Sequence, residues 1–274
     1  MKITASAKKL EINFHFLSVV SMILIFWGNA CDASTPVVDS VKWHPGHYYT
    51  IMGYGKDNPK YMAQVYNELR KTPALRGIQI RYLWAELETE EGAYNFTSID
   101  RQLSELAAQG KRLVIQVQTK SFNPAWKLIP EYLKETKYEG GQFAFSTYGK
   151  KIHKGYNIKL WNLQVRDRLS ALFRALGERY NSHPYFEGIG MIESALGQPV
   201  DPVSSIQIDQ FYNNLLDVHR QMRSQFPNTM TIQEVNYPRF ILESFIHELK
   251  EMGTGLSSPD IFLDESGLHS KETE

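Results

Sequence analysis

A short apolar run at residues 186–193 constrains the fold of this chain more than any other segment. It begins after Pro184, has Ile189 and Met191 at its centre, and ends on a carboxylate, Glu193. A run of this length between Pro and Gly predicts a strand that is buried on both faces, which is typical of parallel sheets covered by helices. In an α/β barrel the carboxyl ends of the strands face the functional site, so Glu193 is a candidate for acid/base chemistry. The competing interpretation is a carboxylate that caps the next helix or pairs with a neighbouring arginine.

Strand-like and helix-like segments alternate along the rest of the chain. The predicted strands are residues 48–53, 77–84, 112–118, 186–193, 229–236 and 258–264, and the predicted helices are residues 59–71, 97–110, 161–180, 209–225 and 239–252. Such alternation requires crossovers between parallel strands, and the expected closed form is the (β/α)8 barrel of TIM-barrel type. Six strands precede the polar segment 266–274, whereas a closed barrel has eight. We therefore expect an α/β fold, a barrel incomplete at its C-terminus, over residues 43–274.

The charge balance and the cysteine count narrow the class of ligand. The 274 residues include 30 basic and 30 acidic side chains, so the formal net charge is zero and gives no electrostatic case for a nucleic acid partner. A neutral polar ligand is expected instead. The single cysteine, Cys31, excludes an intrachain disulfide framework and a cysteine-based zinc site, and no cofactor is indicated.

The first 30 residues have the order of a secretory signal peptide. Lys2, Lys8 and Lys9 precede an apolar stretch at residues 14–27, and small residues then lead to Cys31. This order predicts a signal peptide at residues 1–30 and an exported protein, with a linker at residues 31–42 before the barrel.

Two processing routes fit this leader. Gly28 and Ala30 suit an ordinary signal peptidase cut before Cys31, whereas a cysteine directly after the apolar region resembles a bacterial lipoprotein signal. Gly28 stands where the lipoprotein signal usually has Leu. The apolar stretch is shorter than the roughly 20 residues that span a bilayer, so membrane contact is expected only through a lipid on Cys31.

A long connection, residues 121–158, separates the third predicted strand from the helix at residues 161–180. Connections of this length in compact domains are usually functional lids or disordered insertions, and the many aromatic residues here favour an ordered lid. Trp126 is the candidate anchor of that lid.

Two motifs along the chain have a known counterpart. The first is Tyr82-Leu83-Trp84-Ala85-Glu86-Leu87-Glu88 followed by Glu91-Gly92-Ala93-Tyr94-Asn95-Phe96, and the second leads from residues 175–180 through His183-Pro184 to Glu193. Together, over roughly residues 43–265, they resemble the clan of retaining glycoside hydrolases that includes families 5, 35 and 42. The resemblance implies a TIM barrel, a carbohydrate substrate, and a general acid/base role for the strand-four glutamate, here Glu193.

The chain departs from the pattern of that clan in two places. The acid/base glutamate of the clan usually follows an Asn that contacts the 2-hydroxyl of the sugar, whereas Ile192 precedes Glu193 here. Retaining hydrolysis also needs a second carboxylate about 5 to 5.5 Å from the first, and the clan supplies it from strand seven. Only six strands are predicted, so the chain has no counterpart of strand seven, and Asp264 and Glu265 near the end of the last predicted strand are the available substitutes.

Five further residues are candidate substrate-binding groups: Trp84, Glu86, Gln118, Trp126 and Asn236. Trp84 either stacks on a sugar or packs in the core, and Glu86 either contacts substrate or is a solvated turn carboxylate. Gln118 and Asn236 carry amides that either hydrogen-bond a polyol or satisfy a nearby loop backbone.

A histidine pair before the first strand resembles metal ligands. His44 and His47 flank Pro45-Gly46, but they lie in a predicted turn with no third ligand in view, so no metal site is expected.

Three functions compete. The favoured one is an exported glycoside hydrolase-like protein that acts on O-glycosidic bonds of a polysaccharide or oligosaccharide, with Glu193 as general acid/base. The alternatives are a non-catalytic carbohydrate-binding surface protein and an inactive, truncated fragment of such an enzyme, because an unclosed sheet has bare edges.

Overall fold

The computed structural model describes residues 41–146, 152–236 and 238–259, all within one compact unit, Val38–Glu274. The predicted signal peptide, Cys31, Asp264 and Glu265 lie outside the described residues. Within the described part of the chain, no helix is long and apolar enough to cross a membrane.

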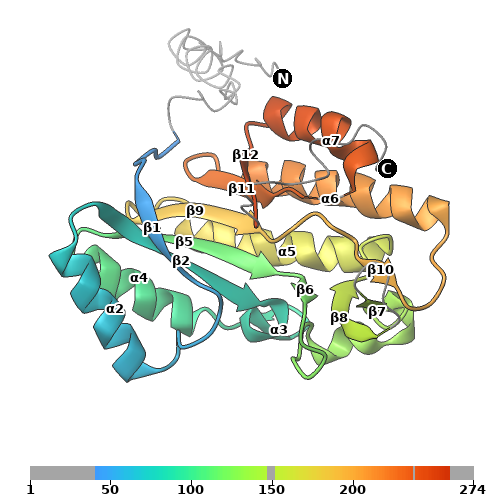
Figure 1. Cartoon of the computed structure of the whole chain (residues 1–274), viewed down its shortest axis with the longest axis horizontal. Helices are drawn as coiled ribbons and strands as arrows, with labels where there is room; N and C mark the ends of the chain where they lie inside the picture. The colour runs from blue at the N-terminus through green and yellow to red at the C-terminus, as the bar shows by residue number, and fades with distance from the viewer. Residues whose placement is uncertain (1–40, 147–151, 237, 260–274) are drawn as a thin grey trace, which may run out of the picture. The chain divides into compact units, whose positions relative to one another are not determined.

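The main sheet has six parallel strands in the order β1-β2-β5-β9-β11-β12. Their bounds are β1 His47–Ile51, β2 Leu75–Leu83, β5 Arg112–Gln118, β9 Phe186–Met191, β11 Met230–Glu234 and β12 Gly255–Ser257. The strands curl into half of a barrel, and helices alternate with them along the chain (Figure 1). The predicted parallel sheet of TIM-barrel type is therefore confirmed.

The sixth strand of the described sheet lies just before the predicted range 258–264. The structure places β12 at Gly255–Ser257, paired with Ile232–Glu234, and residues 260–264 of the predicted strand lie outside the described residues. The Oγ1 atoms of Thr231 and the buried Thr254 lie 3.0 Å apart and tie the start of β12 to β11. The prediction missed this strand because it is short, contains Gly, and has no apolar run.

Five amphipathic helices connect the strands: α2 Pro59–Lys71, α4 Thr97–Ala107, α5 Leu163–Tyr180, α6 Ser205–Gln225 and α7 Arg239–Glu251. They bury apolar stripes against the outer face of the sheet, as Leu169, Leu172 and Leu176 of α5 do. Helix α6 begins four residues earlier than predicted because Ser204 and Gln207 form a capping box.

A polar layer lies on the inner face of the main sheet. Outward-facing Ile80 and Ile115 join the apolar core, while the alternate residues Arg81 and Gln116 point inward. Arg81 Nε donates to Gln116 Oε1 at 2.9 Å, and Arg81 Nη2 lies 2.9 and 3.0 Å from the two carboxylate oxygens of Glu234. Gln116 Nε2 donates to Glu234 Oε1 at 2.8 Å, so the buried carboxylate is fully engaged.

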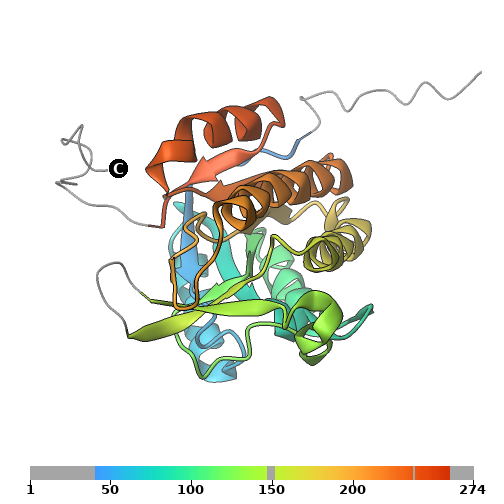
Figure 2. The same ribbon diagram turned by 90° about the vertical axis from the view of Figure 1, so that its right-hand side faces the viewer.

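The long connection forms most of a second, antiparallel sheet, in the order β10-β7-β8-β6. Its strands are β6 Lys120–Ser121, β7 Gln142–Ser146, β8 His153–Ile158 and β10 Gln198–Pro199, and two 3-10 helices, η2 Glu131–Lys134 and η3 Thr136–Tyr138, lie between β6 and β7. The second sheet stands at the carboxyl end of β5, to which the arrow of that strand points in Figure 1. Figure 2, viewed from that side, shows β7 and β8 in front of part of the main sheet. The predicted lid therefore has regular secondary structure of its own.

Two short elements follow β2 and carry the first motif. Helix α3 spans Trp84–Leu87, and β3 Glu88–Glu90 pairs with β4 Ala93–Tyr94 in a hairpin. The hairpin turns at Gly92, whose positive φ of 78° suits glycine.

Candidate functional site

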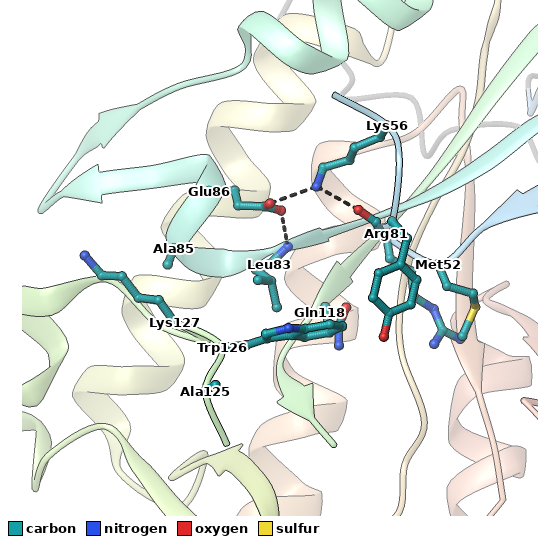
Figure 3. A pocket seen from close by; sticks show the side chains of 12 residues that line it. Met52, Lys56, Arg81, Leu83, Ala85, Glu86, Gln118, Ala125, Trp126 and Lys127 are labelled. Carbon is teal, nitrogen blue, oxygen red and sulfur yellow. Dashed lines mark hydrogen bonds and ion pairs between the residues drawn. The ribbon is translucent and has the colours of Figure 1, made fainter. Parts of the chain in front are cut away.

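A pocket of about 480 Å³ opens at the carboxyl edge of the main sheet (Figure 3). The carboxyl ends of β2 and β5 line it, together with the segments that follow β1, β2 and β6. Three of the predicted substrate-binding residues, Glu86, Gln118 and Trp126, lie in its wall. The pocket thus forms at the edge where a parallel barrel places its functional groups.

Each ionic group of the pocket wall has a partner of opposite charge. Lys56 Nζ donates to Glu86 Oε1 at 2.8 Å, and Glu86 Oε2 accepts the backbone N–H of Leu83 at 2.8 Å. Arg81 is neutralised by Glu234 on the inner face, and Lys127 Nζ lies 3.9 Å from Glu131 Oε2. Because these charges cancel locally, the pocket suits a polar ligand without net charge.

Two aromatic side chains form an apolar part of the pocket wall. The rings of Tyr54 and Trp126 meet edge to face, with centroids 5.3 Å apart and planes at 64°. Tyr54 is 65% exposed. It was not among the substrate-binding residues predicted from the sequence. Apolar ring faces beside polar groups are typical of sites for ligands with one apolar and one polar face.

Glu193 lies at the same edge, two residues after the end of β9. Its Oε2 accepts a hydrogen bond from Asn236 Nδ2 at 3.0 Å and lies 3.4 Å from Lys120 Nζ. The side chain is 14% exposed. In the described part of the chain, the other carboxylate oxygen, Oε1, accepts no hydrogen bond.

Asn236 is oriented by the segment after Glu193. Its Oδ1 accepts the backbone N–H of Ala195 at 3.1 Å, so its Nδ2 points to the carboxylate. Its own backbone N–H donates to Ser194 Oγ at 3.2 Å. An amide from the segment that follows the neighbouring strand β11 therefore contacts Glu193, while the residue directly before Glu193 in the chain is Ile192.

The predicted site residues do not all meet in one cavity. Glu86, Gln118 and Trp126 line the pocket, while Glu193 and Asn236 follow the next two strands of the sheet and do not line it. All five belong to the carboxyl edge. These five residues therefore share one edge of the sheet, but only three of them line the pocket.

Trp84 packs in the core rather than lining the pocket. Its side chain is fully buried, and its Nε1 donates to Glu88 Oε2 at 2.8 Å. Glu88 is buried as well, accepts the N–H of Gly92 at 2.8 Å, and pairs with Arg168. Of the two interpretations of Trp84, the structure supports core packing: the first motif here holds the β3–β4 hairpin onto α5.

The structure adds groups that the sequence did not reveal. Lys120 and the Arg81–Glu234 pair were not predicted. For Arg81 the sequence does hold a signal, because polar residues at alternate positions of the otherwise apolar strand β2 indicate a polar inner face.

The histidine pair lies at the opposite, amino edge of the sheet. His44 Nδ1 lies 3.0 Å from Glu187 Oε2, and Arg112 Nη1 lies 3.2 Å from the same oxygen. Across the described ranges, no group of three or more His, Cys, Asp or Glu side chains is arranged to hold a metal ion.

The sequence of this chain is similar to one known protein family over a part that includes most of the pocket wall and Glu193. The profile of glycoside hydrolase family 42, described as beta-galactosidase, matches residues 67–194, from α2 to just past Glu193. None of the curated proteins matches the chain. The chain resembles the TIM-barrel glycoside hydrolases. The resemblance expected from the two motifs is therefore confirmed.

Solved structures share the fold at low sequence identity. Endo-glycoceramidase II from Rhodococcus sp., in complex with a five-membered iminocyclitol, is 12% identical with a TM-score of 0.50, over 69% of this chain and 48% of that one. The beta-galactosidase from the psychrophilic Marinomonas ef1 is 10% identical with a TM-score of 0.50, over 70% and 37%. The catalytic domain of the beta-amylase from Paenibacillus polymyxa is 9% identical with a TM-score of 0.52, over 77% and 76%. The chain thus matches about half or less of the length of the first two structures.

Proposed function

We propose that this glycoside hydrolase-like chain binds a neutral saccharide at the carboxyl edge of its sheet and that Glu193 is the general acid/base for an O-glycosidic bond. The observation that carries the proposal is the placement of the Glu193 carboxylate. One oxygen is fixed by Asn236 and Lys120, and the other is unengaged among the described residues, at the edge that also holds the pocket.

The chemistry asked of Glu193 is proton transfer to the oxygen of the leaving group, followed by removal of a proton from the attacking water. Asn236 fixes Oε2 and leaves Oε1 for this transfer. A retaining enzyme needs a second carboxylate, which attacks the anomeric carbon from about 5 to 5.5 Å away. Glu234 is buried and engaged by Arg81 and Gln116, so we assign it a structural role on the inner face.

The paired charges and the aromatic wall of the pocket support a neutral saccharide as the ligand. The family whose profile matches is described as beta-galactosidase, so a β-galactoside is the first substrate to test. Trp126 and Tyr54 offer ring faces to the C–H surface of a sugar, and Gln118 offers an amide to its hydroxyls.

The test is hydrolysis of 4-nitrophenyl β-D-galactopyranoside, and then of a panel of other aryl glycosides, by the wild-type chain and by Glu193→Gln. General acid–base catalysis contributes roughly 10²- to 10⁴-fold, so the variant is expected to lose activity by at least about 100-fold with an unchanged circular dichroism spectrum. Wild-type activity in Glu193→Gln would remove that role from Glu193.

A second candidate function is non-catalytic carbohydrate binding. The observation that favours it is that Glu193 does not line the pocket, so the aromatic and amide groups of the pocket wall can contact a ligand without it. Glycan binding that survives Glu193→Gln, with no turnover of any aryl glycoside by the wild type, selects this function. A non-cooperative thermal transition of the purified chain selects an inactive fragment instead.

Export is a proposal as well, supported by the order of the leader alone. Mass spectrometry of the mature N-terminus tests it: cleavage before Cys31 supports export, and a diacylglyceryl group on Cys31 identifies a lipoprotein. An intact Met1 end on the protein isolated from its native cells would contradict both.

A further inference from the structure

The segment after Glu193, residues 194–199, is held by the second sheet. Three strands of that sheet each contribute one side chain that donates to a backbone carbonyl of the segment. The three bonds are Lys120 Nζ on β6 to Ala195 O at 3.0 Å, Asn157 Nδ2 on β8 to Leu196 O at 3.1 Å, and Ser146 Oγ on β7 to Gln198 O at 3.4 Å.

Only one of these three side chains also contacts the carboxylate. The Nζ of Lys120 lies 3.4 Å from Glu193 Oε2, while Asn157 and Ser146 contact the segment only through its backbone in these bonds. Lys120 therefore links the second sheet directly to the proposed acid/base group.

The environment of Lys120 keeps its ammonium in place. The side chain is 3% exposed, and its Nζ lies 4.9 Å from the ring centroid of Phe122 and 4.7 Å from that of Phe145. A buried ammonium is unfavourable unless it has partners, and here a carboxylate, a carbonyl and two ring faces supply them. Because this many groups converge on one nitrogen, its position is defined independently of a ligand.

We propose that Lys120 is a positioning residue for Glu193, a role that rests on the proposed function of that carboxylate. Lys120 and Asn236 together fix Oε2, which leaves Oε1 as the oxygen that exchanges a proton with substrate. The second sheet thus sets the geometry of the site.

The first test compares kcat and KM for 4-nitrophenyl β-D-galactopyranoside in Lys120→Met and in Lys120→Arg. We expect Lys120→Met to lower kcat about 10-fold or more and to leave KM unchanged, because Lys120 holds the carboxylate and does not line the pocket. Lys120→Arg keeps a cation beside Oε2 and is expected to recover part of the lost kcat. An equal loss in both variants, or a change confined to KM, would overturn the proposal.

Two control variants separate the contact with the carboxylate from packing. Asn157→Ala removes a bond to the same segment without removing a contact with Glu193, so it is expected to lower kcat less than Lys120→Met. Lys42→Met removes a lysine that caps the carbonyls of Asn181 and His183 at the amino edge of the sheet. Lys42→Met is expected to lower the melting temperature and to leave kcat and KM unchanged. A loss of kcat in Lys42→Met equal to that in Lys120→Met would contradict a specific role for Lys120.

A second measurement does not depend on activity. In a thermal double-mutant cycle of Lys120→Met and Glu193→Gln, we expect Glu193→Gln to change the melting temperature less in the Lys120→Met background than in the wild type. Additive changes overturn the contact on which the proposal depends. If the wild type turns over no glycoside while the cycle shows coupling, the proposed function fails and the hold of Lys120 on Glu193 stands.

Discussion

Acidification is expected to destabilise this fold through one buried histidine, His219 on α6. The side chain is fully buried, its Nε2 lies 2.7 Å from Gln233 Oε1, and its Nδ1 is buried without a hydrogen-bond partner. Burial lowers the pKa of His219 from 6.5 to about 4, with the contact to Gln233 acting weakly in the opposite direction. A proton on Nδ1 would have no acceptor, which is why the neutral ring is favoured.

The sign and size of the effect follow from the two pKa values. Between pH 6.5 and pH 4 the unfolded chain binds a proton that the folded chain does not, so the stability contributed by neutral His219 is fully present above pH 6.5 and is lost as the pH falls toward 4. The difference of about 2.5 pKa units corresponds to about 3 kcal/mol in the free energy of unfolding.

The assay is urea unfolding at pH 7.0 and pH 4.0 for the wild type, His219→Gln and the control His247→Gln. His247 is exposed on α7. We expect the loss of stability between the two pH values to be smaller by about 3 kcal/mol in His219→Gln than in the wild type and in the control. The same loss in all three proteins would refute the reasoning.

This prediction also concerns the site. Gln233, the partner of His219, donates through Nε2 to Ile192 O at 2.6 Å, in the residue that precedes Glu193. A charged His219 would therefore disturb the backbone that leads to the proposed acid/base.

Three further perturbations test separate parts of the structure. Trp84→Phe removes the hydrogen bond to the buried Glu88 and is expected to lower the free energy of unfolding by about 1 to 3 kcal/mol in urea titrations, with saccharide binding unchanged. Weaker saccharide binding with unchanged stability would show instead that Trp84 contacts the ligand. Trp126→Ala is expected to raise the KM for an aryl glycoside about 10-fold, equivalent to about 1.4 kcal/mol, with little change in melting temperature, and an unchanged KM would remove Trp126 from the ligand surface. Arg81→Met leaves the carboxylate of Glu234 buried without its cation and is expected to lower the free energy of unfolding by about 3 to 5 kcal/mol in urea titrations. Most of this loss is expected to be recovered in the double variant with Glu234→Leu. A double variant as unstable as the single one would contradict this account of the inner layer.

The fold was predictable because its main signals are local and periodic. The apolar run that ends at Glu193, the stripe along α5 and the helix at Pro59–Lys71 each specify an element by themselves, and their alternation specifies a parallel sheet. The strand β12 was not predicted because its pairing with β11 depends on backbone and threonine contacts that leave no apolar pattern.

The site was predictable only as far as the edge of the sheet. Strand ends indicated Gln118, Glu193 and Asn236 correctly as neighbours at one edge, because the carboxyl ends of parallel strands meet there. Side-chain direction was not available from the sequence, so the burial of Trp84 against Glu88 was one of two open interpretations. The contact between Lys120 and Glu193 joins residues 73 positions apart through the second sheet, and no local pattern encodes it.

The most direct test of the central claim, that Glu193 protonates a leaving group, is the dependence of the Glu193→Gln defect on leaving-group acidity. The kcat/KM values of wild type and variant are compared for lactose and for 2,4-dinitrophenyl β-D-galactopyranoside, whose leaving group departs without protonation. The account predicts a large defect on lactose and a defect smaller by about 100-fold or more on the dinitrophenyl substrate. Equal defects on both substrates, or none on either, would contradict it.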